Sequence, residues 1–236
     1  MSIKVGVCGF PASLEKLNEL LDVIEVQKTF YTIPGTKAVE NWKKKAPKVI
    51  WSVKANQIIT HSISSPTYRK CNLKLTEEER TMAGEFKLNE LTMKIYQNIL
   101  EIGLTLDARF ILFQTPLSFK MTKENVERIY KFFETVKRPP GIKFLLEPRG
   151  WGGDTLKKLL EELSLIHVVD PFKEKKVYGD ITYYRLHGVG GYRYSYSEGE
   201  LFNLKEIAED NSYILFNNTD MLNNAVALRK LLLSSY

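Results

Sequence analysis

Short apolar runs and longer segments with helical spacing alternate along most of the chain. An apolar or aromatic run bounded by glycine or proline predicts a buried strand, whereas apolar residues three and four positions apart predict an amphipathic helix. The predicted strands are residues 3–8, 23–26, 49–55, 109–114, 142–147, 165–170, 182–188 and 212–217. The predicted helices are residues 13–21, a segment through 42 to 45, 86–100, 122–136, 154–163, 200–209 and a closing helix from 219 or 220 to 233.

Two segments interrupt this alternation. Residues 56–85 form a long polar segment that contains Thr60, His61 and Pro66. A connection of that length is typical of a functional lid or binding loop, or of a partly disordered segment. Residues 171–180, which begin with Pro171, lack helical spacing and predict an irregular crossover between the sixth and seventh strands.

Repeated strand–helix units without a second composition zone predict an α/β protein built as a single (β/α)8 TIM-type barrel domain over residues 1–236, with a long loop insertion at about 56–85. The structural alternative is a doubly wound open sheet. Its dinucleotide-binding form is disfavoured because Gly6-Val7-Cys8-Gly9 has the wrong glycine spacing after the first strand. The chain also lacks a Gly-Lys-Ser/Thr phosphate loop.

Composition adds limits on the kind of protein. The 236 residues are 44% hydrophobic and 26% charged, with a formal net charge of +6. The basic balance favours anionic partners, although lysines spread over helix surfaces would have the same composition. Cys8 and Cys71 are too few for a disulfide framework, Met1 to Lys4 shows no signal-peptide pattern, and no apolar run approaches a membrane span. We therefore expect a cytoplasmic protein that spans no membrane; the pattern specifies neither a cofactor nor an oligomeric state.

Polar and charged side chains recur at the ends of the predicted strands. In a TIM barrel the carboxyl ends of the strands meet at one mouth, where active sites of this fold are built. Any one of these residues alone is consistent with a solvated strand end, and the acids and bases together are also consistent with a structural ion network. Taken together they predict a site that includes Glu25, Lys54, Gln114, Glu147, Asp170, Arg185, His187 and Asn217.

The seventh strand makes this prediction specific. Alternate strand positions face the same side, so Tyr183, Arg185 and His187 share one face of residues 182–188. A buried guanidinium needs a carboxylate partner. We therefore expect Arg185 within ion-pair reach of Glu147, Asp170 or Glu25, with His187 above it and facing the cavity.

Several short motifs together resemble one family. They are Thr29-Phe30-Tyr31 with Pro34, Trp42 before Pro47, Lys54 with Thr60-His61, Gln114-Thr115-Pro116, Glu147-x-Arg149, Asp170-Pro171, Arg185-Leu186-His187-Gly188 with Tyr192 and Tyr196, and Phe216-Asn217-Asn218. In these motifs the chain resembles the YecE-like family, domain of unknown function 72, over nearly its whole length. The resemblance implies a TIM barrel and does not specify a reaction.

The chemistry of these residues predicts an enzyme that acts on a small anionic substrate, phosphorylated or carboxylated, by general acid/base catalysis. Arginine and lysine suit phosphate or carboxylate recognition, carboxylates suit a general base, and histidine suits a proton carrier. The candidate catalytic residues are Glu147, Asp170, His187, Glu25 and His61. The candidate substrate-binding residues are Lys54, Arg149, Arg185, Gln114, Tyr31, Tyr192, Tyr196, Asn217 and Asn218, with Tyr194 as a further tyrosine of the mouth.

Two alternatives stay open at this point. A nucleic-acid-binding or nuclease-like protein could use the basic run Lys43-Lys44-Lys45 and the Tyr192-Arg193-Tyr194 loop to contact phosphates and stack on bases. A divalent ion held by Glu147, Asp170, His187 and Glu25 is compatible in ligand type. However, Arg185 close to His187 disfavours a cation there, so we expect no metal. His167 is out of phase with Asp170 and is expected to face the helices.

Overall fold

Eight parallel strands pair in sequence order and close into a ring, because β8 pairs with β1. This ring is seen in a computed structural model of the chain, which describes residues 2–234. It confirms the predicted (β/α)8 barrel. The strands are β1 Lys4–Cys8, β2 Val23–Val26, β3 Ile50–Lys54, β4 Phe110–Thr115, β5 Lys143–Pro148, β6 Ile166–Val169, β7 Thr182–Leu186 and β8 Ser212–Phe216.

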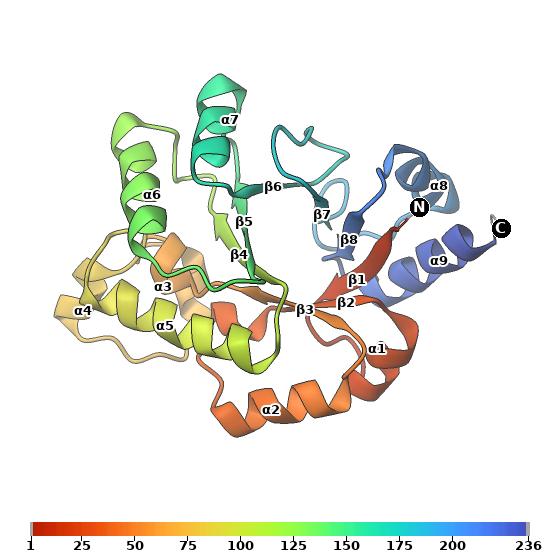
Figure 1. Cartoon of the computed structure of the whole chain (residues 1–236), viewed down its shortest axis with the longest axis horizontal. Coiled ribbons are helices and arrows are strands. Elements are labelled where there is room, and N and C mark those ends of the chain that lie inside the picture. Colours follow the sequence, from red (N-terminus) through yellow and green to blue (C-terminus); the bar gives the residue numbers. More distant parts are fainter. Residues whose placement is uncertain (1, 235–236) are drawn as a thin grey trace.

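Helices surround the ring and cover most of its outer surface (Figure 1). The main helices are α1 Leu14–Leu20, α2 Thr36–Lys45, α5 Glu90–Thr105, α6 Lys123–Thr135, α7 Gly153–Glu162, α8 Glu198–Ile207 and α9 Met221–Leu233. Two predicted caps are present: the hydroxyl of Ser13 accepts the Lys16 N–H, and that of Thr122 accepts the Asn125 N–H. Within residues 2–234, no helix is both long enough and apolar enough to cross a membrane.

Three predicted helix starts were wrong, and one of them is that of the helix expected from residue 200, which begins at Glu198 after its Ser197 cap. The helix expected from residue 86 begins at Glu90, because Phe86 has a positive φ of 54° and Asn89 forms the capping box with Thr92. The helix expected to be capped by Asp154 begins at Gly153, so Asp154 lies in its first turn and not at the cap. An aspartate in the first turn still favours the helix, because its charge faces the positive end of the helix dipole.

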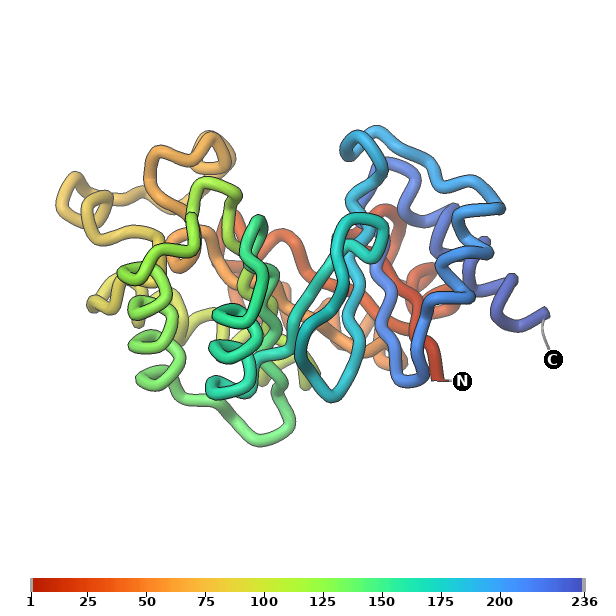
Figure 2. Tube along the Cα trace, turned by 90° about the horizontal axis from the view of Figure 1, so that it is seen from above, coloured from red at the N-terminus to blue at the C-terminus, as the bar shows by residue number. Residues whose placement is uncertain are grey.

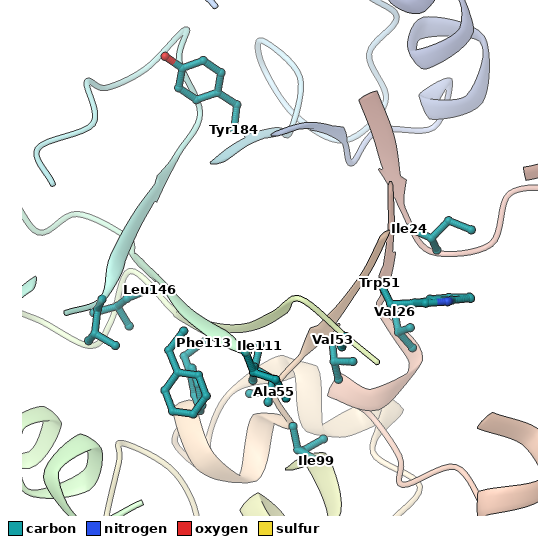
Figure 3. Packing of buried hydrophobic residues seen from close by; sticks show 14 of the residues in the cluster. Ile24, Val26, Trp51, Val53, Ala55, Ile99, Ile111, Phe113, Leu146 and Tyr184 are labelled. Carbon is teal, nitrogen blue, oxygen red and sulfur yellow. The ribbon is translucent and has the colours of Figure 1, made fainter. Parts of the chain in front are cut away.

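Each strand divides its side chains between two environments, as the alternation predicted. The inner face carries a small apolar cluster made of Cys8, Val23, Phe110, Leu112, Leu145, Ile166, Val168, Ile181, Tyr183, Tyr213 and Leu215. The outer face packs against the helices, and Figure 3 shows Ile24, Val26, Trp51, Ile111, Phe113 and Leu146 on that outer side. The larger apolar core therefore lies between the strands and the helices, which leaves the inner face free to carry polar groups at its upper end.

The segment of residues 56–85 is not irregular throughout. It contains the short helices α3 Gln57–Thr60, η2 Pro66–Lys70 and α4 Glu77–Met82. The Tyr68 hydroxyl donates to the backbone oxygen of His61 at 3.1 Å, and Gly84 with a φ of 83° packs against the same oxygen. In Figure 2 this segment and the segment that follows β7 rise on the same side of the molecule.

The connection between β6 and β7 has no helix, as the sequence predicted (Figure 1). His167 on β6 faces outward toward this connection, where its Nδ1 accepts the Val177 N–H at 3.2 Å. The predicted outward direction of His167 is confirmed, but the side chain meets this helix-free connection where a helix was expected.

Candidate functional site

The carboxyl ends of the strands place a layer of polar side chains directly above the apolar interior of the barrel. Because all strands are parallel, their last inward-facing residues meet at one end. Glu25, Lys54, Gln114, Glu147 and Arg185 occupy these positions, and each is buried. The alternation that places Val23 and Leu145 inside the barrel also brings Glu25 and Glu147 inward, two residues further along their strands.

Arg185 forms ion pairs with two of the three carboxylates considered for it, Glu25 and Glu147, and not with Asp170. Its Nη2 donates to Glu25 Oε1 at 2.8 Å, and its Nη1 forms an ion pair with Glu147 Oε2. Burial works to lower the pKa of Arg185, but Glu25 and Glu147 hold that pKa well above its ordinary value. Glu25 also accepts the Tyr183 hydroxyl at 2.9 Å. Arg185 and Glu25 are fully buried, so the network of Arg185, Glu25, Glu147 and Tyr183 lies below the surface of the mouth and holds Glu147 in position.

Arg149, just after β5, connects Glu147 to His187. Its Nε donates to Glu147 Oε1 and its Nη2 to His187 Nε2, both at 2.8 Å. Burial works to raise the pKa of Glu147, yet the guanidinium groups of Arg185 and Arg149 hold it well below its ordinary value. Glu147 is therefore a poor general base in the free protein and acts as an anchor for both arginines.

His187 has a defined environment at the end of β7. Guanidinium N–H groups of Arg149 and Arg185 both point at its Nε2, which must therefore accept, so that the proton of the neutral ring is on Nδ1. The backbone N–H of His187 donates to Asp170 Oδ2 at 3.2 Å. Burial, with the charges of both arginines, lowers the pKa of His187 to about 3, so the ring is neutral at neutral pH.

Among the described residues 2–234, Lys54 on β3 has no carboxylate partner. Its Nζ donates to Gln114 Oε1 at 2.8 Å and lies 4.0 Å from the centre of the Phe30 ring, and it forms no ion pair within the described residues 2–234. Burial and the nearby Arg185 charge lower the pKa of Lys54 to about 7. His61 packs against the same Phe30 ring, and its Nδ1 lies 2.8 Å from the Thr60 hydroxyl. Burial and the Lys54 charge lower the pKa of His61 to about 3.

Two cavities open at this end of the barrel and share Arg149 and Leu117 in their walls. The first, about 350 Å³, is lined by Glu147, Asp170, His187, Lys173, Glu174 and Gly150 besides the shared pair. The second, about 600 Å³, is lined by Lys54, His61, Gln114, Tyr31, Tyr192 and Asn217, together with residues of the long segment after β3. Arg149 and Leu117 thus form a wall between the two halves of one mouth.

The structure does not bring every predicted residue to this mouth. Tyr196 is buried, its hydroxyl accepts the Gly188 N–H at 2.9 Å, and its ring stacks on Phe172. Asn218 is buried as well and donates to the backbone oxygen of Tyr194 and to Asn224. These residues support the loop after β7 and line neither cavity. The Tyr194 hydroxyl is likewise engaged, with Glu200.

Sequence reasoning missed several lining residues. Lys173 lines the first cavity, with its Nζ 3.4 Å from Asp170 Oδ2 and 3.3 Å from the Gly188 oxygen. Lys70 and Gln27 line the second cavity. Lys173 lies three residues beyond Asp170, in the connection for which the sequence predicted no regular structure. Lys70 lies in the long segment after β3. Neither Lys173 nor Lys70 is at the end of a strand, so the strand pattern did not predict that they line the cavities.

The three acids and one histidine considered for a metal ion do not form a metal site. Arg185 stands between Glu25 and Glu147 and pairs with both. Among residues 2–234, no group of three or more histidine, cysteine, aspartate or glutamate side chains has the geometry to hold a metal ion. Positive guanidinium groups therefore occupy the places between these carboxylates.

The fold and this layer of paired charges define a TIM-barrel protein with a polar mouth at the carboxyl ends of its strands. The family model described as "Protein of unknown function DUF72" matches residues 9–235. The chain belongs to this family, which confirms the resemblance found in its motifs. No curated protein matches the chain.

Solved structures agree on the fold. Two crystal structures of a DUF72 family protein from Enterococcus faecalis are similar to the chain. The first has a TM-score of 0.74 at 20% sequence identity, and the match covers 99% of this chain and 96% of that chain. The second has a TM-score of 0.71 at 22% sequence identity, and the match covers 98% of this chain and 97% of that chain. A xylose isomerase domain containing protein from Salmonella typhimurium has a TM-score of 0.56 at 15% identity, with 100% and 98% covered. Endonuclease IV from Thermus thermophilus has 0.55 at 10%, with both chains fully covered at 100%. At these identities the likenesses concern the fold alone.

Proposed function

We propose that this protein is an enzyme that binds a small anionic substrate, phosphorylated or carboxylated, in the mouth of the barrel and acts on it by general acid/base chemistry. The observation that carries the proposal is the position of Arg149. Its side chain is 36% exposed and lies in the wall shared by both cavities. Glu147 and His187 fix its Nε and Nη2, whereas its Nη1 donors bond no described residue.

An arginine held in this way is prepared for an anion. Its plane is fixed by two partners, so little side-chain freedom is lost when the remaining N–H groups bind a carboxylate or phosphate. Lys70 and Lys54 add positive charge to the second cavity, whose lining includes no carboxylate among the described residues, whereas Lys173 in the first cavity is paired with Asp170. Cavities of about 350 and 600 Å³ lie in the size range of sites for small molecules.

Groups that could move protons line the same cavities. Asp170 and His187 face the first cavity, and His61 and Lys54 face the second. Both imidazoles are neutral in the free protein, since burial and neighbouring cations lower their pKa values to about 3. An anion bound at Arg149 would offset those cations and raise the pKa of His187, so proton transfer would be coupled to substrate binding. The proposal invokes no cofactor, and the roles of Glu25 and Arg185 in it are to position Glu147.

The test is substrate depletion and anion binding in parallel. Pools of phosphorylated and carboxylated metabolites are incubated with wild type and with Arg149→Gln, and losses are followed by mass spectrometry; binding of inorganic phosphate is measured by calorimetry. Arg80→Gln, at an exposed ion pair, is the control. We expect turnover and phosphate binding in wild type and in the control, and a loss of at least about tenfold in Arg149→Gln, as expected for a charge-assisted contact. Absence of both signals from wild type would overturn the proposal.

The nucleic-acid alternative finds less support. In the basic run of α2, Lys43 pairs with Asp107 and Lys45 pairs with Glu15, so two of its charges are already offset. This run ends α2 directly before β3, which places it at the amino-terminal end of the barrel, opposite the mouth. What supports the alternative is the exposed Tyr192 of the loop after β7. Binding of DNA or RNA that weakens steeply as salt rises would favour it.

A further inference from the structure

The charges in the buried layer are not evenly shared. Glu25 and Glu147 form ion pairs with Arg185, and Glu147 pairs with Arg149 as well. Two carboxylates thus offset two guanidinium groups. Lys54 lies in the same layer, and its partners are neutral: the amide oxygen of Gln114 and the ring of Phe30.

A protonated Lys54 is therefore the surplus cation of this layer. Burial and the repulsion from Arg185 lower its pKa to about 7, so a large part of the amine is neutral near physiological pH. An ordinary exposed lysine with a pKa near 10.4 is only about 0.04% neutral at pH 7. Because Lys54 lines the cavity of about 600 Å³, its lone pair can be reached by a small molecule that enters the mouth.

We propose that Lys54 is a nucleophile that forms an imine with the carbonyl carbon of the substrate, and that the substrate is a small aldehyde, ketone or oxo acid that carries a carboxylate or phosphate. This inference rests on the proposed function and names the reacting group within it. Amines activated by a buried, cationic environment are suited to this reaction.

The chemistry balances without an oxidant or reductant. The Lys54 lone pair attacks the carbonyl carbon, a C–N bond forms, and the carbonyl π electrons take up a proton to give a carbinolamine. The nitrogen then loses a proton, and the hydroxyl takes up a proton and leaves as water while the nitrogen lone pair forms the C=N bond, which gives the protonated imine; loss of its N–H proton gives the neutral imine. The ring of Phe30 contacts both Lys54 and His61, so His61 is placed to carry the proton that the departing hydroxyl needs.

The surroundings favour an anionic carbonyl compound over a neutral one. A protonated imine is again a cation in a layer whose carboxylates already have partners. An anionic group of the same substrate supplies the missing negative charge. Arg149 lies in the wall of the same cavity and offers the donors that would hold that group.

The test traps the imine in the full chain. Wild type is incubated at pH 7 with pyruvate, glyoxylate or dihydroxyacetone phosphate, reduced with sodium borohydride, and mapped by peptide mass spectrometry. We expect the reduced adduct on the peptide that contains Lys54, its absence from Lys54→Arg and Lys54→Met, and its retention in Lys158→Arg, which removes an exposed amine that lines neither cavity. The two acids and the phosphate ester show which anionic group the site prefers.

A second measurement does not depend on the choice of carbonyl compound. With limiting formaldehyde and cyanoborohydride at pH 7, Lys54 should be methylated at least about tenfold faster than exposed lysines such as Lys158, because of its larger neutral fraction. Lys54 that reacts no faster than exposed lysines, and forms no adduct with any of the three compounds, overturns the inference. If wild type then still binds phosphate through Arg149, the proposed function stands without the imine; if it binds none and turns nothing over, both fail.

Discussion

Arg185 on β7 and Glu147 on β5 form an ion pair at the mouth of the barrel. Their two strands are separated by the single strand β6. Both side chains are buried, and Glu25 on β2 completes the pair from the other side. Three strands are thereby joined through one guanidinium at the level where the polar layer meets the apolar interior.

Arg185→Met should lower the free energy of unfolding by about 3 kcal/mol, because it leaves the buried carboxylate of Glu25 without its guanidinium partner and removes one of the two guanidinium partners of Glu147. Urea unfolding followed by circular dichroism measures this change. Arg80→Met removes an arginine from the exposed pair with Glu77 and should change stability by less than about 1 kcal/mol. Equal effects of the two substitutions would contradict a supporting role for the Arg185 network.

His187→Ala should change the free energy of unfolding by less than about 1 kcal/mol and weaken phosphate binding, since the side chain is 20% exposed at the cavity. His167→Ala is the matched control, because it removes a buried imidazole outside the barrel and strands the Val177 N–H. It should cost about 1–3 kcal/mol and leave phosphate binding intact. Calorimetry for binding and urea unfolding for stability separate the two roles, and a reversed pattern would show that the strand phases are misassigned.

Stability should fall as the pH is lowered from 6.5 toward 5. The pKa of His61 is lowered to about 3 from an ordinary 6.5, so the unfolded chain takes up a proton in this window and the folded chain does not. The contribution of a neutral His61 is thus present above pH 6.5 and is lost as the pH falls toward 3, with a limit of about 1.4 kcal/mol per pH unit for one group.

His61→Gln should make this pH dependence shallower by the contribution of one group, because burial also lowers the pKa of His187 to about 3 and that of His167 to about 4, and both keep their contributions. Unfolding free energies of wild type and variant measured at pH 7, 6 and 5 provide the comparison, and this range avoids the titration of most carboxylates. A variant with the same slope as wild type would mean that His61 takes up its proton in the folded protein.

Gly84→Ala should destabilise the segment of residues 56–85. The added methyl would overlap the backbone oxygen of His61, and the φ of 83° is itself unfavourable for alanine. Gly141→Ala is the control: its φ is 86°, but the methyl would meet open space. We expect a cost of about 1–2 kcal/mol for Gly141→Ala from the backbone alone, and a further 1–3 kcal/mol for Gly84→Ala from the overlap. Urea unfolding measures both, and equal costs would show that the packing around His61 is loose.

Much of the barrel follows from local patterns in the chain. Strands buried on both faces read as short apolar runs, and their alternation specifies which residues face inward. The inward phase of Glu25, Lys54 and Arg185 was predicted in this way, and so was an ion pair of Arg185 with Glu147, Asp170 or Glu25, of which the structure shows Glu147 and Glu25. Parallel strands then bring these residues together without further information.

The remaining features depend on contacts that a local pattern does not contain. Tyr196 belongs to a tyrosine-rich loop that suggests a binding surface, but its hydroxyl serves the Gly188 N–H and its ring fills the core. Lys173 reaches the cavity from an irregular connection, where side-chain directions follow no period. Lys54 has no carboxylate partner among the described residues because Arg185 pairs with Glu25 and Glu147, and Arg149 pairs with Glu147. A local sequence pattern does not contain this pairing.

The helix-free connection after β6 has a consequence for how the barrel opens. β6 is a short strand whose register pairs Val168 with Tyr183 and Val169 with Tyr184 on the β7 side, and the connection between these two strands contains no helix. A closed ring has no strand edges, so a transient break here would expose two edges at once and make them available to other chains. Asp170, just after β6, accepts the backbone N–H of His187, just after β7, and this hydrogen bond connects the carboxyl ends of the two strands. Amide exchange should therefore be fastest along β6 and β7, and a ligand that holds His187 in place should slow it.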